Sequence, residues 1–258
     1  MKIAILGSGS SGNSIYIESA KSKILIDAGF SGKVIKEKME KIGKNLDDIK
    51  ALIVTHEHGD HILGAGILVR RHKMPIYITR ESYLAGEKKL GNIEDTFLNF
   101  VEEDFEIDDL KIKTIDVLHD AQRTVAYLIE NSAGKKIGIA TDIGHTDSTI
   151  KYYFRDLDVL VIESNYDHSM LMTCGYPADL KSRIKSNRGH LSNEDCGKFI
   201  SDVYHEGLKK VYLVHISRDS NTKHLAYNTV KSELDRNGIE VEVEAVPQDT
   251  HTHLYHLD

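Results

Sequence analysis

The chain has 258 residues, of which 40% are hydrophobic and 28% are charged. This is ordinary globular composition and excludes long disordered regions. The net charge of −7 excludes nucleic-acid binding by bulk electrostatic attraction, and Cys174 and Cys196 form no CxxC pair, which excludes a cysteine-rich zinc site.

The first predicted element is a strand at residues 2–6, which ends in glycines and is too short an apolar run for a signal peptide. No apolar segment approaches the ~18 residues of a membrane span. We therefore expect a cytoplasmic protein with no membrane partner. Further strands are expected at residues 14–18, 23–27 and 51–55, and apolar residues at helical spacing predict a helix at residues 31–43.

The remainder of the chain interleaves further strands and helices. The helix expected at residues 193–206 has the clearest boundaries, because Ser192 can cap it, Asp195 completes a capping box and Gly207 can end it. This order predicts an α/β sandwich, a single domain over residues 1–258 whose two halves meet near residue 131. The other expected strands are at residues 76–79, 110–118, 125–130, 136–141, 159–163, 211–215 and 240–245, and the other helices at 177–185 and 222–237.

A glycine-rich loop follows the first strand. Gly7, Gly9 and Gly12 match the G-x-G-x-x-G pattern of dinucleotide-binding folds. That interpretation requires a helix to begin at the third glycine, whereas an alternating strand follows here. We therefore favour a hairpin loop, in which Ser10, Asn13 and backbone amides remain candidates for contact with a substrate phosphate.

A cluster of metal-ligand side chains occupies residues 56–61, with the sequence HEHGDH. His56 and His58 are two residues apart, so an extended segment places both rings on one side. Gly59 permits a sharp turn and close backbone approach. Asp60 and His61 then point back from the start of the next helix. This spacing is improbable by chance and predicts a metal site rather than an exposed polar loop.

Three further candidate ligands each follow a predicted strand: His119, Asp142 and His215. Strand ends are where α/β folds gather their active-site groups. A donor set of imidazoles and carboxylates without thiolate suits two divalent ions of zinc, manganese or iron, and the sequence does not choose among them.

These residues resemble the HxHxDH pattern and accompanying motifs of the metallo-β-lactamase fold superfamily. The resemblance implies an αββα sandwich with a dinuclear metal site at the edge of two mixed β-sheets. By family pattern, Asp27 supports the site from behind and Asp142 bridges both metals. The first metal would be held by His56, His58 and His119, and the second by Asp60, His61 and His215.

Taken together, the motifs are most similar to the YycJ/WalJ exonuclease family, which is related to tRNase Z-type phosphodiesterases. The resemblance rests on residues 6–13, 25–29, 163–165, 189–195 and 215–217, and it departs from the family at Tyr166, where histidine is usual. It implies a 5′→3′ double-stranded DNA exonuclease that uses a hydroxide activated by two metals. Asp60 would orient that nucleophile, and His190, held by Glu163, would protonate the leaving oxygen.

Basic residues running into His190 support a polyanionic substrate, with Arg183 and Arg188 as candidate phosphate contacts beside Ser217. Duplex DNA is the favoured partner. The alternatives are hydrolysis of a thioester, a lactam or a small cyclic phosphodiester, and RNA processing. A flavodiiron-type redox protein and a non-catalytic nucleic-acid-binding module are the alternatives from other classes.

Overall fold

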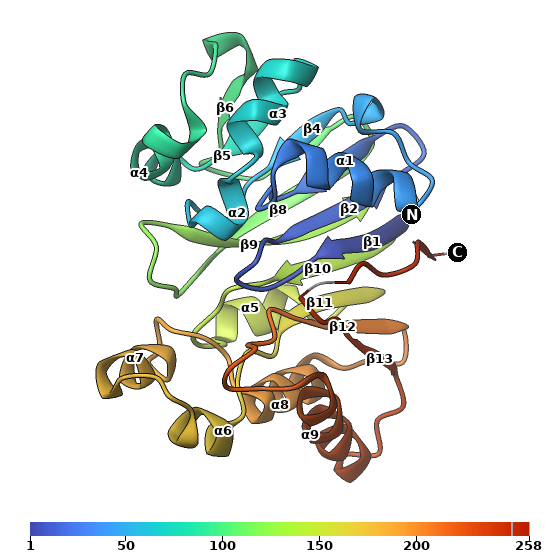
Figure 1. The fold of residues 1–258 in the computed structure, drawn as a ribbon. Coiled ribbons are helices and arrows are strands. Elements are labelled where there is room, and N and C mark those ends of the chain that lie inside the picture. Colours follow the sequence, from blue (N-terminus) through green and yellow to red (C-terminus); the bar gives the residue numbers. More distant parts are fainter. Residues whose placement is uncertain (249, 258) are drawn as a thin grey trace.

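The computed structural model describes residues 1–248 and 250–257. Two mixed sheets pack face to face, and helices cover their outer sides, which confirms the predicted αββα sandwich (Figure 1). The first sheet has the strand order β14-β1-β2-β3-β4-β5-β6. Its strands are β1 (Lys2–Gly7), β2 (Ser14–Glu18), β3 (Lys23–Ile26), β4 (Ala51–Ile53), β5 (Ile76–Ile78), β6 (Leu98–Phe100) and β14 (Tyr255–His256).

The second sheet has the order β13-β12-β11-β10-β9-β8-β7. The chain changes sheets between β6 and β7, and not near residue 131 as the sequence suggested. Residue 131 is instead the last residue of β9. This strand lies inside the second sheet, where it pairs antiparallel with both β8 and β10. The strands are β7 (Phe105–Ile107), β8 (Leu110–Val117), β9 (Thr124–Asn131), β10 (Lys136–Ala140), β11 (Val159–Glu163), β12 (Lys210–Val214) and β13 (Glu242–Ala245).

Helices form the outer layers. None of those in the described part of the chain is long and apolar enough to cross a membrane. The helices are α1 (Gly32–Lys41), α2 (Gly59–Ile62), α3 (Ala65–His72), α4 (Arg80–Leu90), α5 (Ser148–Tyr153), α6 (His168–Thr173), α7 (Ala178–Ile184), α8 (Asn193–Val203) and α9 (Lys223–Arg236), with 3-10 turns at η1 (Leu46–Asp48) and η2 (Asp95–Phe97).

Alternating side chains along the strands build the layers. In β3, Ile24 and Ile26 enter the core between the two sheets, whereas Leu25 points to the outer face and packs with residues of α1 and α3. A third buried cluster joins the other sheet to α5, α8 and α9. Helices α6 and α7 share only a small separate cluster and border one end of the sandwich (Figure 1).

The strand directions gather several chain segments at one edge. Strands β10, β11 and β12 are parallel, and β3 is parallel to β4. Because β8 is antiparallel to β9 and β9 is antiparallel to β10, β8 runs in the direction of β10. The loops after β3, β4, β8, β10, β11 and β12 carry most of the candidate site residues, and each leaves the carboxyl end of its strand.

Candidate metal centre

Three loops meet with very little space between them. The backbone N–H of Asn13 donates to the carbonyl of Asp60 at 2.7 Å, and that of Gly29 donates to the carbonyl of Asn13 at 2.9 Å. A Cβ at residue 29 would lie 1.7 Å from the carbonyl oxygen of Asp60, so only glycine fits there. We expected the close approach at Gly59, but a Cβ there would meet only the flexible side chain of Lys89, 3.3 Å away.

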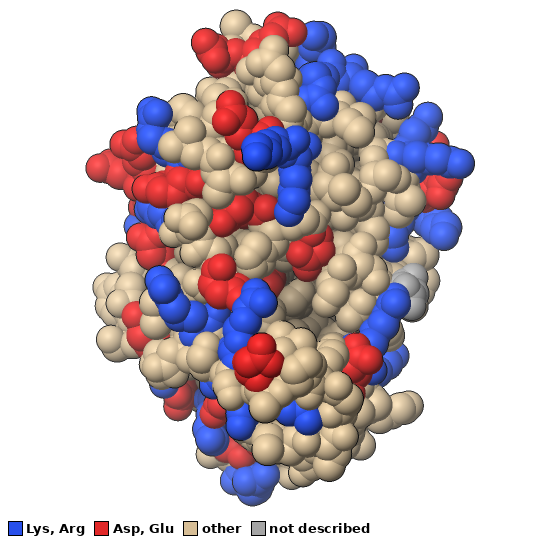
Figure 2. Space-filling model, turned by 60° about the vertical axis from the view of Figure 1, so that its left-hand side comes forward, with Lys and Arg blue, Asp and Glu red and all other residues tan. Residues whose placement is uncertain are grey.

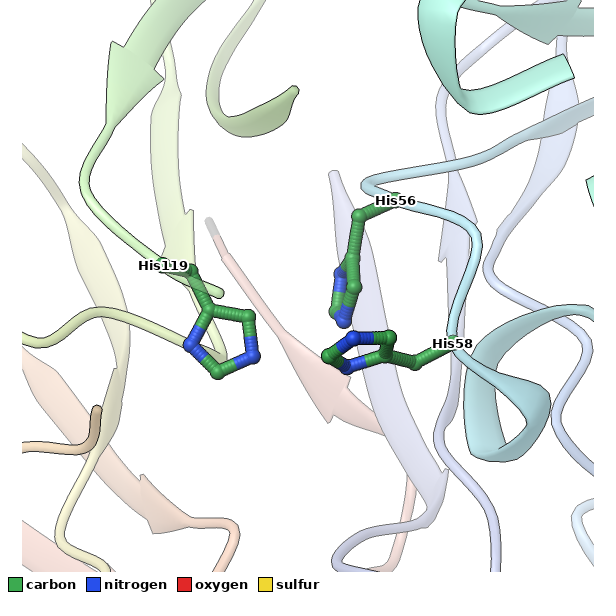
Figure 3. Close-up of side chains that lie close together, drawn as sticks. All are labelled: His56, His58 and His119. Atoms are coloured by element: carbon green, nitrogen blue, oxygen red, sulfur yellow. The ribbon is translucent and has the colours of Figure 1, made fainter. Parts of the chain in front are cut away.

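The first group of ligand atoms comes from His56, His58 and His119. One ring nitrogen of each lies within 4.8 Å of the others. Figure 3 shows the rings turned toward one another across the gap between the loops after β4 and β8. The two loops belong to different sheets, so the group forms only when the sheets pack together.

The second group comes from Asp60, His61 and His215, whose ligand atoms meet the same 4.8 Å limit. Asp142 lies between the two groups. Its Oδ2 is 3.1 Å from Nε2 of His61, and its Oδ1 is 3.6 Å from Nε2 of His119. One carboxylate therefore faces both groups, as a bridging ligand would.

The buried polar atoms of this cluster fit divalent cations. Nε2 of His56, His119 and His215 and Oδ2 of Asp142 are all buried, and none has a hydrogen-bond partner within the described chain. Buried polar atoms are nearly always paired, so four ligand atoms buried without a hydrogen-bond partner fit a site that binds cations. Imidazole nitrogens and carboxylate oxygens are ligands for zinc, manganese and iron.

The pKa shifts of His56, His119 and Asp60 favour the forms of these side chains that bind metal. Burial lowers the pKa of His56 and of His119, which favours the neutral form that binds metal. Burial alone would raise the pKa of Asp60, but the contact with His215 lowers it to about 2, so this carboxylate is ionised at neutral pH.

Most rings of the centre are held from behind by a second contact. Oδ2 of Asp27 lies 2.7 Å from Nδ1 of His61, and Asp27 also accepts hydrogen bonds from the backbone N–H and the hydroxyl of Thr55. Nδ1 of His56 lies 3.0 Å from the hydroxyl of Thr55. Asp27 and His215 have φ angles of 59° and 54°, a region that non-glycine residues rarely adopt and that often marks functional sites.

Glu163 contacts two imidazoles with one oxygen. Its Oε1 lies 2.7 Å from Nδ1 of His190 and 2.8 Å from Nδ1 of His215. Its Oε2 accepts hydrogen bonds from the backbone N–H groups of Ile143 and Leu191. We expected Glu163 to pair with His190 alone, but it also fixes a candidate metal ligand, so its loss would disturb both.

A cavity of about 200 Å³ opens beside these groups and includes His190 and His215 in its wall. The candidate contacts Ser10, Arg183 and Ser217 also line it. On the face that Figure 2 brings forward, acidic and basic side chains are intermixed rather than forming one basic field.

The two other expected contacts, Asn13 and Arg188, have different surroundings, as does Tyr166, where the sequence departs from the family pattern. Asn13 is buried and anchors the glycine loop, since its Oδ1 accepts from the backbone N–H of Gly9 and its Nδ2 lies 2.9 Å from Nε2 of His61. Arg188 is exposed and, among the described residues, is not part of the lining of this cavity. Tyr166 is buried and forms a β-bridge with Ser192.

The sequence analysis assigned no site role to three residues of the centre. The hydroxyl of Thr55 donates a hydrogen bond to Asp27 and lies 3.0 Å from Nδ1 of His56. Nδ2 of Asn165 donates to the carbonyl of His215 at 2.8 Å. Oδ1 of Asp120 lies 3.2 Å from Nε2 of His119. Each directly precedes or follows a recognised segment, and that adjacency was the only signal in the sequence.

Comparison with known proteins gives matches over most of the chain. Residues 22–216 match the family model described as the beta-lactamase superfamily domain. The chain is 35% identical to exodeoxyribonuclease YycJ of Bacillus anthracis, covering 93% of this chain and 92% of that protein. It is 36% identical to exodeoxyribonuclease WalJ of Streptococcus pneumoniae, covering 96% and 94%. The crystal structure of the metallo-beta-lactamase fold protein YhfI from Bacillus subtilis superimposes with a TM-score of 0.72 at 18% identity, covering 97% and 98%.

Proposed function

Since the chain belongs to the beta-lactamase superfamily and, within it, to the family of the exodeoxyribonucleases YycJ and WalJ, we propose that it is a 5′→3′ exonuclease acting on double-stranded DNA. It is a metal-dependent hydrolase with the metallo-β-lactamase fold. The nuclease activity, the duplex preference, the polarity and a cytoplasmic location are parts of the proposal. The names of the relatives supply the substrate class.

The position of His190 is the structural observation that supports the proposed phosphodiester chemistry. Its Nδ1 faces Glu163 at 2.7 Å, and the residue lines the cavity next to the two ligand groups. Burial alone would lower the pKa of His190, but the charge of Glu163 and the contact with it raise the pKa. The ring is therefore suited to hold a proton that a departing oxygen requires.

The ligand groups would hold two divalent ions, which supply a water of lowered pKa and offset charge on the phosphoryl oxygens. Asp60 accepts a hydrogen bond from the attacking water and orients it toward phosphorus. Glu163 accepts a hydrogen bond from Nδ1–H of the protonated ring of His190, and Nε2–H of this imidazolium gives its proton to the departing 3′ oxygen, which leaves the ring neutral with hydrogen on Nδ1. Arg183 and the hydroxyls of Ser10 and Ser217 contact the phosphate from the cavity wall.

The experiment is digestion of the same duplex labelled at its 5′ or its 3′ end, with Mn²⁺ or Zn²⁺ supplied. The 5′ label is expected to appear at once in mononucleotides, while the 3′ label remains in a ladder of shortening strands. Single-stranded DNA and RNA of the same sequence are expected to be cut more slowly. Addition of EDTA serves as the control and is expected to stop cleavage.

Other patterns of product would contradict the proposal. Internal nicks, early release of the 3′ label, or faster cleavage of RNA would each reject the activity as stated. Hydrolysis of a thioester or lactam substrate with no action on DNA would place the chain in another branch of the superfamily.

A further inference from the structure

Asp120 has no part in the chemistry described so far, yet it faces the first ligand group. Its Oδ1 lies 3.2 Å from Nε2 of His119 and 3.7 Å from Nε2 of His58. This oxygen is buried, and it has no hydrogen-bond partner among the described residues. Buried carboxylate oxygens are rarely left without a partner, so this position points to a contact with the metal centre.

His58 is the ring of the first ligand group that lacks an orienting contact. His56 has Thr55 at 3.0 Å, and His119 has the carbonyl of Gly189 at 2.9 Å from its Nδ1. For His58, Oδ1 of Asp120 lies 3.7 Å from Nε2, close enough to become such a contact. Histidines that bind metal almost always present their other nitrogen to a carboxylate or carbonyl, which fixes the ring.

The other oxygen of Asp120 points away from the centre and toward α7. Oδ2 accepts a hydrogen bond from Nε of Arg183 and also contacts its Nη2. The side chain of Arg183 is 63% exposed, and both residues line the cavity beside His190. A planar guanidinium held by one carboxylate oxygen keeps further donors for a second anion.

We propose that Asp120 is a positioning residue of the metal centre, which orients His58 through Oδ1 and holds Arg183 at the cavity rim through Oδ2. The geometry gives one carboxylate two tasks, one on each side. The task toward the metal stands without any assumption about substrate. The task toward Arg183 rests on the proposed function, because it assumes that an anionic phosphodiester enters the cavity.

The plainer alternative is that Asp120 merely tethers α7 to the sandwich. In that case the ion pair between Oδ2 and Arg183 would be the whole role of Asp120. The burial of Oδ1 beside two candidate ligand rings would then have no explanation. The two accounts differ in one measurable property, the affinity for metal.

The test measures zinc affinity of metal-free protein by competition with a chromophoric chelator. Asp120→Ala is expected to weaken one of two zinc sites by about 10–100-fold, the usual cost of losing such an orienting group. Asp120→Asn, which keeps the shape but not the charge, is expected to lie between Asp120→Ala and the unmodified protein. Arg183→Ala is expected to keep both zinc affinities and to raise KM for bis(p-nitrophenyl) phosphate at unchanged kcat.

The matched control is Asp116→Ala. Asp116 lies in β8 and forms a similar carboxylate–arginine pair with Arg123, at 2.6 Å, but it is not among the candidate metal ligands. This variant is expected to keep both zinc affinities. It separates the loss of any arginine pair from the loss of this particular one.

Unchanged zinc affinity in Asp120→Ala and Asp120→Asn would overturn the inference and leave Asp120 as a tether. Equal weakening in Arg183→Ala would overturn it as well, because the effect would then pass through the arginine. If Asp120→Ala does not fold, Asp120→Asn alone decides between these results. A protein that binds zinc but does not cut DNA would refute the proposed function and leave this comparison valid.

Discussion

Among single side chains, His190 and His58 have separable tasks. His58 belongs to the first ligand group, whereas His190 contacts Glu163 and lines the cavity. Removal of a ligand should release metal. Removal of a proton donor should slow the reaction and leave metal in place, because the ligand groups named above remain complete.

We therefore predict that His190→Ala keeps two metal ions per chain and lowers kcat on phosphodiesters by about 10²–10⁴-fold. Metal content by elemental analysis and steady-state kinetics on the same preparation check this. His224→Ala, which removes an exposed histidine on α9, is the control and should change neither quantity. Normal turnover by His190→Ala would remove His190 from the mechanism.

The sequence identified the residues whose type is itself a signal. The run of histidines at residues 56–61 and the strand-terminal His119, Asp142 and His215 all lie in the centre. It could not identify Asp120 or the tight contact at Gly29, because their roles arise from neighbours supplied by distant loops. Asn13 shows the reverse error, since a polar side chain in a glycine loop was expected to face substrate but is buried.

At the level of elements, α8 connects stability to the site. Ser192 caps this helix, and its hydroxyl accepts a hydrogen bond from the backbone N–H of Asp195 at 3.0 Å. The cap lies two residues after His190. The helix ends at Val203 and not at residue 206 as expected, with Tyr204 in an extended conformation before Gly207.

We predict that Ser192→Ala lowers the free energy of unfolding by about 1 kcal/mol, the usual value of an N-cap hydroxyl. Urea denaturation in EDTA measures this without a contribution from bound metal. Thr222→Ala, which removes the equivalent cap of α9, should cost a similar amount and provides the comparison. An unchanged urea midpoint in Ser192→Ala would show that the cap does not stabilise α8.

Helices α8 and α3 differ in how much of their position the local sequence reveals. The capping box formed by Ser192 and Asp195 predicted the start of α8. Helix α3 has no side-chain cap at its start, and it is followed by Lys73 in a left-handed conformation with φ of 54°, where glycine would have been the usual signal. Its position depends on packing of Leu68 and Val69 against the first sheet, which a local pattern does not reveal.

On the scale of the whole molecule, the fold brings together groups that are far apart in the sequence. Asp27 and His56 follow strands of the first sheet, whereas His119, Asp142 and His215 follow strands of the second. The sequence predicted the layers, because alternation and helical spacing are local. It misplaced the junction between the halves, because β8 and β9 could have paired with either sheet until their partners were known.

The central claim is that this edge of the sandwich holds two divalent cations. Crystals of the protein soaked in Mn²⁺, with anomalous scattering recorded, test it most directly. We predict two peaks about 3.5–4 Å apart, one among His56, His58 and His119 and one among Asp60, His61 and His215, with Asp142 between them. No peak at this edge, or a single peak elsewhere, would contradict the account.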